Sequence, residues 1–249
     1  MILALLACRP DPAPEDLEQL CGYLFAHLDD ERDREMEDGL SNLDAWLIEK
    51  GIGQDGLEVD RLAEDSVVDL AGDKTHTAGG AVGAAVDDRI THPVLAIAEV
   101  LIVADQYEVF DGTYEEYSRT FLGDVDCFMS QDCDRLDAEN DFIARYGGVI
   151  TVESEMHSQS RWVDLDGELA LIQRGWLSGE TIVSIDWATV EEQYILTAAL
   201  PRGDETLRMQ TIWIKAVLGE DAAPESAALN VMVNSMSAQS QTIQDYLDE

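Results

Sequence analysis

The chain is 249 residues long, and 46% of its residues are hydrophobic, five tryptophans among them. A chain of this length and composition can bury a core, which excludes disorder along its whole length. Its 52 acidic and 15 basic residues give a net charge of -37, which repels nucleic-acid phosphates and anionic lipid head groups. We therefore expect no nucleic-acid partner.

The amino terminus is an apolar run, MILALLAC, followed at once by the Pro-rich charged stretch RPDPAPED. Leu5 stands three residues before Cys8, and the small residue Ala7 stands directly before it. This pattern resembles the lipobox of bacterial lipoproteins. The resemblance implies that the Cys8 thiol is acylated and that its acyl chains anchor the protein to a membrane. Residues 1–8 are then a lipoprotein signal remnant, and residues 9–14 form an extended tether.

The lipobox resemblance also implies a place in the cell. It indicates a membrane-anchored protein of the cell envelope, and Arg9 in place of an Asp after the cysteine favours the outer membrane. Signal peptides carry a basic leader before an apolar stretch of about 7 to 15 residues, which this sequence lacks. We therefore expect the natural start to lie upstream of Met1. The alternative is a buried amino-terminal strand in which Cys8 is a small core residue.

Two amphipathic helices are predicted after the tether. Apolar residues recur at helical spacing in two runs: Leu17, Leu20, Cys21, Leu24 and Leu28, then Met36, Leu40, Leu43 and Leu47. A weaker pattern over residues 57–70 predicts a third helix and completes a helical region at residues 15–71. The segment from 71 to 89 is small and Gly-rich without a clear period, so we interpret residues 72–92 as a linker.

The next two segments are harder to assign. Residues 93–104 are almost wholly apolar, which fits a buried strand or a buried helix, and we favour the strand because strands follow later in the chain. Residues 113–129 carry Tyr114, Tyr117, Phe121 and Phe128 at roughly helical intervals and predict a short helix.

Beyond Gly147 the sequence changes to short runs rich in Val, Ile, Thr, Trp and Tyr, which are typical of strands. Asp166 and Gly167 predict a type I′ hairpin turn, because both central residues of that turn need a positive φ. In the last run, residues 207–213 alternate, which predicts an antiparallel sheet with one packed and one partly wet face. An apolar stripe then predicts a closing helix over residues 224–247 that packs on the sheet.

The resulting fold class is α+β: amino-terminal helices, then an antiparallel β-sheet packed by a long carboxy-terminal helix, with residues 93–249 as the sheet domain. This layout resembles the helix-grip arrangement of START-like lipid-transfer and polyketide-cyclase proteins. The resemblance implies an apolar cavity between the sheet and the last helix. A lipocalin-like barrel or a cone-shaped sheet of the nuclear-transport-factor type fits the same order of elements.

Few residues of the sequence are candidates for a binding, catalytic or metal site. Four tryptophans of the β region are candidates for a ligand pocket, although such residues more often belong to a core: Trp162, Trp176, Trp187 and Trp213. His157 is a candidate acid or base whose commoner role is structural. The acidic run between Asp132 and Asp141 lacks the spacing of a calcium loop. No nucleophile elbow, phosphate cradle or zinc pattern occurs, so we expect no catalytic residue, cofactor or metal.

The remaining cysteines suggest one disulfide. Cys127 and Cys133 are close enough in sequence to close a small loop, which fits an oxidising compartment, and Cys21 lies in a helical stripe and is expected to be buried.

Two functions are consistent with these patterns. The first is a lipid-anchored, non-enzymatic cell-envelope protein that binds a small apolar molecule or a protein partner. The second is a soluble acidic protein of a salt-adapted organism, with an enzyme among the options and no lipid anchor; its charge predicts stability that rises with ionic strength.

Overall fold

The computed structural model describes residues 12–53, 55–146, 150–219, 221–222 and 224–249. Within them, ten strands form one antiparallel sheet in the order β1-β2-β9-β8-β6-β5-β4-β3, with β7 paired to β5 and β10 paired to β9. The strands are β1 (Leu57–Val59), β2 (Val82–Ile90), β3 (Tyr114–Phe121), β4 (Arg135–Tyr146), β5 (Ile150–Leu165), β6 (Glu168–Leu177), β7 (Ile182–Val183), β8 (Ala188–Arg202), β9 (Glu205–Leu218) and β10 (Asp221–Ala222).

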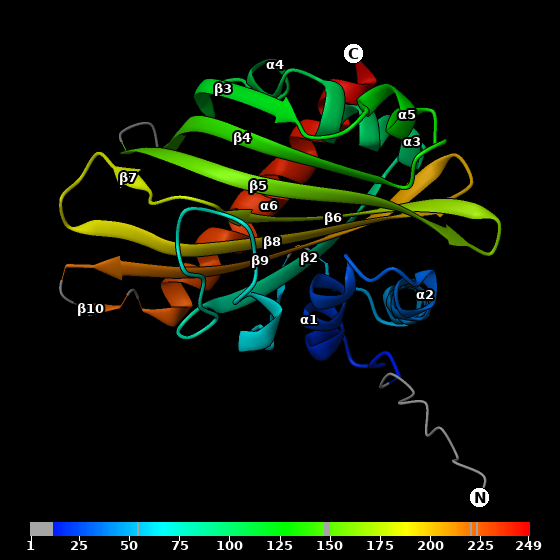
Figure 1. Cartoon of the computed structure of the whole chain (residues 1–249), viewed down its shortest axis with the longest axis horizontal. Coiled ribbons are helices and arrows are strands. Elements are labelled where there is room, and N and C mark those ends of the chain that lie inside the picture. The colour runs from blue at the N-terminus through cyan, green and yellow to red at the C-terminus, as the bar shows by residue number, and fades with distance from the viewer. Residues whose placement is uncertain (1–11, 54, 147–149, 220, 223) are drawn as a thin grey trace, which may run out of the picture.

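Helices cover both faces of this sheet. They are α1 (Leu17–His27), α2 (Asp33–Glu49), α3 (Val94–Ala98), α4 (Gln106–Val109), α5 (Val125–Met129) and α6 (Glu225–Asp248), with a 3-10 turn at Glu64–Ser66 and a π-helical turn at Glu99–Val103. In Figure 1, α6 (red) runs obliquely across the strands on one side of the sheet. The helices α1 and α2 (blue) lie side by side on the other side. The α+β, helix-grip-like layout predicted from the sequence is confirmed.

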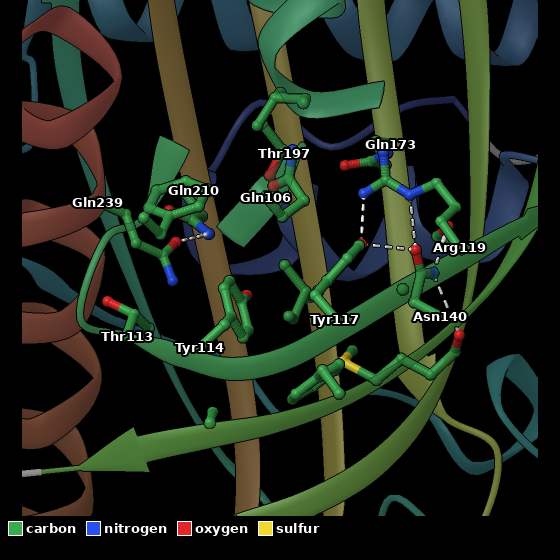
Figure 2. Close-up of a pocket in the computed structure, with 18 of the residues that line it drawn as sticks. Gln106, Thr113, Tyr114, Tyr117, Arg119, Asn140, Gln173, Thr197, Gln210 and Gln239 are labelled. Atoms are coloured by element: carbon green, nitrogen blue, oxygen red, sulfur yellow. Dashed lines mark hydrogen bonds between the residues drawn. The ribbon is translucent and has the colours of Figure 1, made fainter. Parts of the chain in front are cut away.

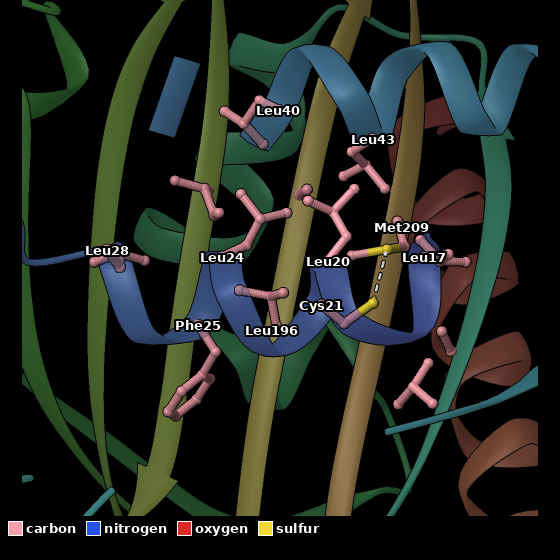
Figure 3. Packing of buried hydrophobic residues seen from close by; sticks show 14 of the residues in the cluster. Leu17, Leu20, Cys21, Leu24, Phe25, Leu28, Leu40, Leu43, Leu196 and Met209 are labelled. Atoms are coloured by element: carbon pink, nitrogen blue, oxygen red, sulfur yellow. Dashed lines mark hydrogen bonds between the residues drawn. The ribbon is translucent and has the colours of Figure 1, made fainter. Parts of the chain in front are cut away.

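Alternate residues of each central strand point to opposite helices. One side, here called the α1 face, packs against α1 and α2 through the apolar stripes predicted from the sequence. Figure 3 shows Leu20, Leu24 and Phe25 of α1 lying over Leu196 of β8 and Met209 of β9. The opposite side, here called the α6 face, lies under α6, which contacts β2 and β9.

The hairpin between β5 and β6 confirms the strongest local prediction. Asp166 and Gly167 take φ values of 56° and 92°, and the Gly167 N–H donates to Asp164 Oδ1 at 2.8 Å. The register that follows pairs Trp162 with Leu171 and His157 with Trp176.

The interpretation of residues 72–92 as a linker was wrong, because β2 occupies 82–90 and lies inside the sheet between β1 and β9. Its small residues serve close packing instead of flexibility. A Cβ on Gly83 would lie 2.4 Å from Cδ1 of Trp213, its pairing partner on β9. The same strand pairs with β1, so residues 57–70 hold a short strand and a 3-10 turn where we predicted a helix.

Residues 93–104 are helical, which corrects the predicted strand. Pro93 precedes α3, and the chain continues into the π-helical turn. A π turn leaves carbonyl groups without their usual partners. The side chain of Gln106 supplies donors, with Nε2 2.7 Å from Val100 O and 3.1 Å from Ala104 O.

The predicted helix at residues 113–129 is mostly the strand β3, and only α5 at its end is helical. The aromatic spacing resembles that of a helix because β3 is irregular. Its register with β4 shifts between Tyr114 and Glu116. A bulge of this kind brings residues an odd number apart onto the same face of a strand. Tyr114 and Tyr117 therefore contact each other, with ring centroids 5.1 Å apart.

Candidate functional site

The α6 face has a gap in its apolar packing. Its buried apolar residues fall into two separate clusters, one around Trp162 and Ile243 and the other around Ile212 and Met236. A cavity of about 170 Å³ borders both clusters, because Ile243 of the first and Ile195, which packs against the second, both line it. Its other lining residues come from β3, β4, β5, β6, β8, β9, α6 and the segment between residues 101 and 113. The sheet, α6 and the segment between residues 101 and 113 therefore border an open space on this face.

Most of the residues that line this cavity are polar, so it is not by itself the apolar cavity expected between the sheet and the last helix. Gln173, Thr197 and Gln210 come from neighbouring strands, and Gln239 comes from α6 (Figure 2). Gln210 Nε2 lies 3.0 Å from Gln239 Oε1, and Gln173 Nε2 lies 3.0 Å from Ser160 Oγ.

A network of three side chains forms one wall of the cavity. Tyr117 and Arg119 lie two residues apart on β3, and Asn140 lies opposite them on β4 (Figure 2). The Tyr117 hydroxyl donates to Asn140 Oδ1 at 2.8 Å, and Arg119 Nε donates to the same oxygen at 2.7 Å. Arg119 Nη2 lies 2.5 Å from the Tyr117 hydroxyl, and Nη1 donates to the carbonyl of Ile102. Burial raises the pKa of Tyr117 although Arg119 opposes the shift, so the hydroxyl keeps its proton at neutral pH.

A second cationic side chain, Arg208 of β9, borders the cavity near α6. It donates to Ser240 Oγ at 2.8 Å and to Gln210 Oε1 at 2.8 Å, and it lies 3.6 Å from Asp88 Oδ1. Burial raises the pKa of Asp88, while the nearby Arg208 opposes that shift. Arg208 and Gln210 are both buried, so the predicted wet face of this strand is instead covered by α6.

An apolar cleft adjoins the polar cavity. It has a volume of about 350 Å³ and is formed by β5, β7, β8, β9 and the first turns of α6. Its apolar lining residues include Val152, Ile214 and Val231. Trp187 also lines the cleft, and 58% of its surface is exposed to solvent. Phe142 and Gln193 line both the cleft and the cavity, so the two spaces share a boundary.

The four tryptophans proposed as pocket residues separate in the structure. Trp187 lines the apolar cleft, but the other three are buried in packed regions. Each of those three indoles donates to a backbone carbonyl: Trp162 to Phe128, Trp176 to Ala71 and Trp213 to Asp60.

His157 borders the cavity, but its ring belongs to the α1 face. The imidazole stacks on Trp176 with ring centroids 4.6 Å apart, and Nε2 lies 3.9 Å from Asp137 Oδ2. The contact with His157 is the main cause that lowers the pKa of Asp137. This placement matches the structural role that we considered the commoner one for a strand histidine.

The cysteines occupy three different settings. Cys8 lies outside the described residues, so its acylation stays a prediction. Cys127 and Cys133 form a disulfide that closes the loop after α5. Cys21 is buried on the α1 face, with Sγ 3.8 Å from Met209 Sδ, and burial raises the pKa of its thiol to about 12.

The described parts of the chain contain neither a cluster suited to a metal ion nor a helix suited to span a membrane. No group of three or more His, Cys, Asp or Glu side chains there is placed to hold a metal ion. The acidic residues Asp137, Glu139 and Asp141 lie at alternate positions along β4. No helix within those parts has both the length and the apolar character required to cross a bilayer.

The sequence did not single out the polar wall of the cavity. The aromatic spacing assigns Tyr117 to a helical stripe, and Arg119 and Asn140 are isolated polar residues that belong to no motif. One signal was available on β9, where Arg208 and Gln210 alternate with apolar residues and were interpreted as solvent-facing.

Comparisons with known proteins found no matching family model and no matching curated protein. Among solved structures, a START superfamily protein from Mycobacterium smegmatis matches with a TM-score of 0.42 and 9% identity, covering 67% of this chain and 97% of that one. Truncated norcoclaurine synthase from Thalictrum flavum matches with a TM-score of 0.38 and 11% identity, covering 68% of this chain and 95% of that one. Similarities this weak assign the chain neither a family nor an activity.

Proposed function

We propose that the protein binds a small amphipathic molecule between its sheet and α6. The apolar body of the molecule occupies the cleft beside Val152 and Ile214, and its polar end enters the cavity beside Tyr117. The observation that carries this proposal is the shared boundary of the two spaces at Phe142 and Gln193. Ligand sites combine an apolar lining with a few placed polar groups, and this pair of spaces has both.

The geometry supports binding more than catalysis. The polar groups around the cavity are mainly amides, hydroxyls and arginines, and His157 turns its ring to the other face. Amides and hydroxyls fix the orientation of a ligand by hydrogen bonds, whereas acid–base catalysis needs a group that titrates near the working pH.

A neutral, environment-sensitive dye tests the proposal. We expect N-phenyl-1-naphthylamine to bind the wild-type protein with a rise in fluorescence and to be displaced by long-chain alcohols. Ala228→Trp fills the cleft from α6 and should weaken dye binding at least about tenfold by blocking the apolar site. Ala238→Trp is the matched control, because Ala238 is an exposed residue of the same helix and lies outside the cleft.

The two tryptophan substitutions on α6 distinguish the outcomes. Weak binding to Ala228→Trp with normal binding to Ala238→Trp supports a site in the cleft. Equal dye binding by wild type and Ala228→Trp, or no binding by the wild type, overturns the proposal.

We also propose that Cys8 anchors the protein to the cell envelope, which rests on the lipobox-like residues and the Pro-rich stretch after them. Expression from the natural start codon with a labelled fatty acid should label the wild type and the Cys21→Ala control. The Cys8→Ala variant should be unlabelled and released from membranes. A wild-type protein that is unlabelled and retains Met1 excludes the anchor and favours the soluble alternative.

A further inference from the structure

The described lining of the polar cavity contains arginines and no acidic residue, inside a strongly acidic protein. The whole chain has 52 acidic residues against 15 basic ones. Yet the described residues that line the cavity include Arg119, Arg174 and Arg208 and no Asp or Glu. The described lining of the adjoining apolar cleft also has no Asp or Glu, but it has no arginine either, so the arginines distinguish the polar cavity.

Two of the three arginines are neutralised by acids at their guanidinium groups. Arg174 pairs with Asp29 and donates to the carbonyl of Phe25, both on the α1 face. Arg208 lies 3.6 Å from Asp88. Neither has a full positive charge to offer a ligand in the cavity.

Arg119 is different, because no carboxylate of the described chain forms an ion pair with it. Every other described arginine has such a partner. The contacts of Arg119 are all to neutral acceptors: Asn140 Oδ1, the Tyr117 hydroxyl and the carbonyl of Ile102. A partly buried cation without a counter-ion is costly unless an anion joins it.

The geometry around Arg119 suits an anion. Its neutral contacts hold the guanidinium in place, and that group carries more N–H donors than those three contacts use. A planar guanidinium pairs with carboxylate or phosphate oxygens through two parallel N–H donors. The position also connects to the apolar cleft, since the Tyr117 ring stacks on Phe142 with centroids 6.2 Å apart, and Phe142 lines both spaces.

We propose that the ligand carries an acidic oxyanion head group, a carboxylate or a phosphate, which Arg119 binds beside Tyr117 while an alkyl or similar apolar body lies in the cleft. This inference rests on the proposed ligand-binding function and specifies the class of ligand. The excess of acidic residues elsewhere would repel such a ligand, so the local cation is needed for binding as well as for orientation.

Ligands that share one alkyl chain test the head group. Dodecanoate, dodecyl phosphate and dodecan-1-ol are compared as competitors of the neutral dye at neutral pH. We expect at least one of the two anions to bind the wild type about tenfold more tightly than the alcohol, because hydrogen bonds to a charged group are stronger than neutral ones. The tighter of the two anions identifies the head group.

Variants of Arg119 connect this preference to the residue. Arg119→Gln should remove the preference for the anion by weakening anion binding, and continued binding of the alcohol shows that the variant is folded. Arg119→Lys keeps the charge but loses the planar fork and should keep part of the preference. Arg89→Gln, an exposed arginine paired with Glu205, is the matched control and should bind all three compounds as the wild type does.

The outcomes separate the two proposals. If none of the compounds binds, the proposed function fails. If the alcohol binds as tightly as both anions, or if Arg119→Gln keeps the preference, the assignment of an anionic head group is overturned while the ligand-binding function survives.

Discussion

The two faces of the sheet use the same strands in opposite ways. On the α1 face, alternate residues of β5, β6, β8 and β9 join the helix stripes in one continuous apolar cluster (Figure 3). On the α6 face, the intervening residues form two smaller apolar clusters. The polar cavity shown in Figure 2 borders both of them. We therefore expect the α1 face to contribute more to stability than the α6 face, where the proposed ligand site lies.

Arginines show the same division of roles. On the α1 face, Arg161 donates to the carbonyl of Leu28 at 2.9 Å, and Arg174 donates to that of Phe25 at 2.7 Å. These carbonyls belong to the carboxy-terminal end of α1, where a helix carries partial negative charge and favours cations. The two arginines therefore fix α1 on the sheet, whereas Arg119 on the other face has only neutral partners.

The largest effect is expected from Phe25→Ala on the α1 face. Phe25 is fully buried and contacts Tyr194 and Trp213 edge to face. Its removal should lower the free energy of unfolding by about 3–5 kcal/mol, since a packed site cannot collapse around the lost ring. Urea denaturation followed by tryptophan fluorescence measures the change.

The matched change on the α6 face is Phe142→Ala. Phe142 borders open space on two sides, so its truncation should cost clearly less stability than Phe25→Ala while weakening dye binding. Equal losses of stability for the two variants would contradict the division between a packed face and a binding face.

A smaller effect is expected from Glu192→Gln, which tests a buried ionic cluster on the α1 face. Glu192 Oε2 lies 3.0 Å from Lys74 Nζ and 3.6 Å from His76 Nδ1, and it accepts a hydrogen bond from Tyr194 at 3.1 Å. Burial acts to raise the pKa of Glu192, but the contacts with His76 and Lys74 outweigh it, so the pKa is lowered.

The sign of the pH effect follows from that lowered pKa. Ionised Glu192 stabilises the native state above its usual pKa of 4.5, and this contribution is lost as the pH falls through the lower native value. At neutral pH the Gln variant should be about 1–2 kcal/mol less stable than the wild type. The gap in urea-denaturation free energies should close on acidification, and a gap that widens instead would show that the carboxylate is not stabilising.

The smallest effect on stability is expected inside the cavity. The double variant Gln173→Leu with Ser160→Ala replaces both partners of a 3.0 Å hydrogen bond by apolar groups. Because no partner is left unsatisfied, the free energy of unfolding should change by less than about 1 kcal/mol. Competition assays should show weaker discrimination of anion over alcohol, and a loss of stability comparable to that of Phe25→Ala would show that this network belongs to the core.

The sequence alone determined those elements whose pattern is local. The stripes of α1, α2 and α6 repeat at the helical period, and the Asp166–Gly167 turn is set by the positive φ of its own residues. The antiparallel order of the later strands follows from short turns between them. The α+β layout could therefore be predicted with no knowledge of contacts between distant residues.

Only the tertiary structure decided the elements and residues whose meaning depends on a distant partner. Gly83 belongs to a strand because Trp213 fills the space beside it, and the aromatic residues of β3 share a face because a bulge shifts their register. The proposed role of Arg119 depends on the lack of an ion pair with any carboxylate of the described chain. Only the folded structure sets the distances between its guanidinium group and those carboxylates. Local periodicity records the secondary structure of a segment but not its neighbours in space, so the cavity and its charge became visible only in the folded molecule.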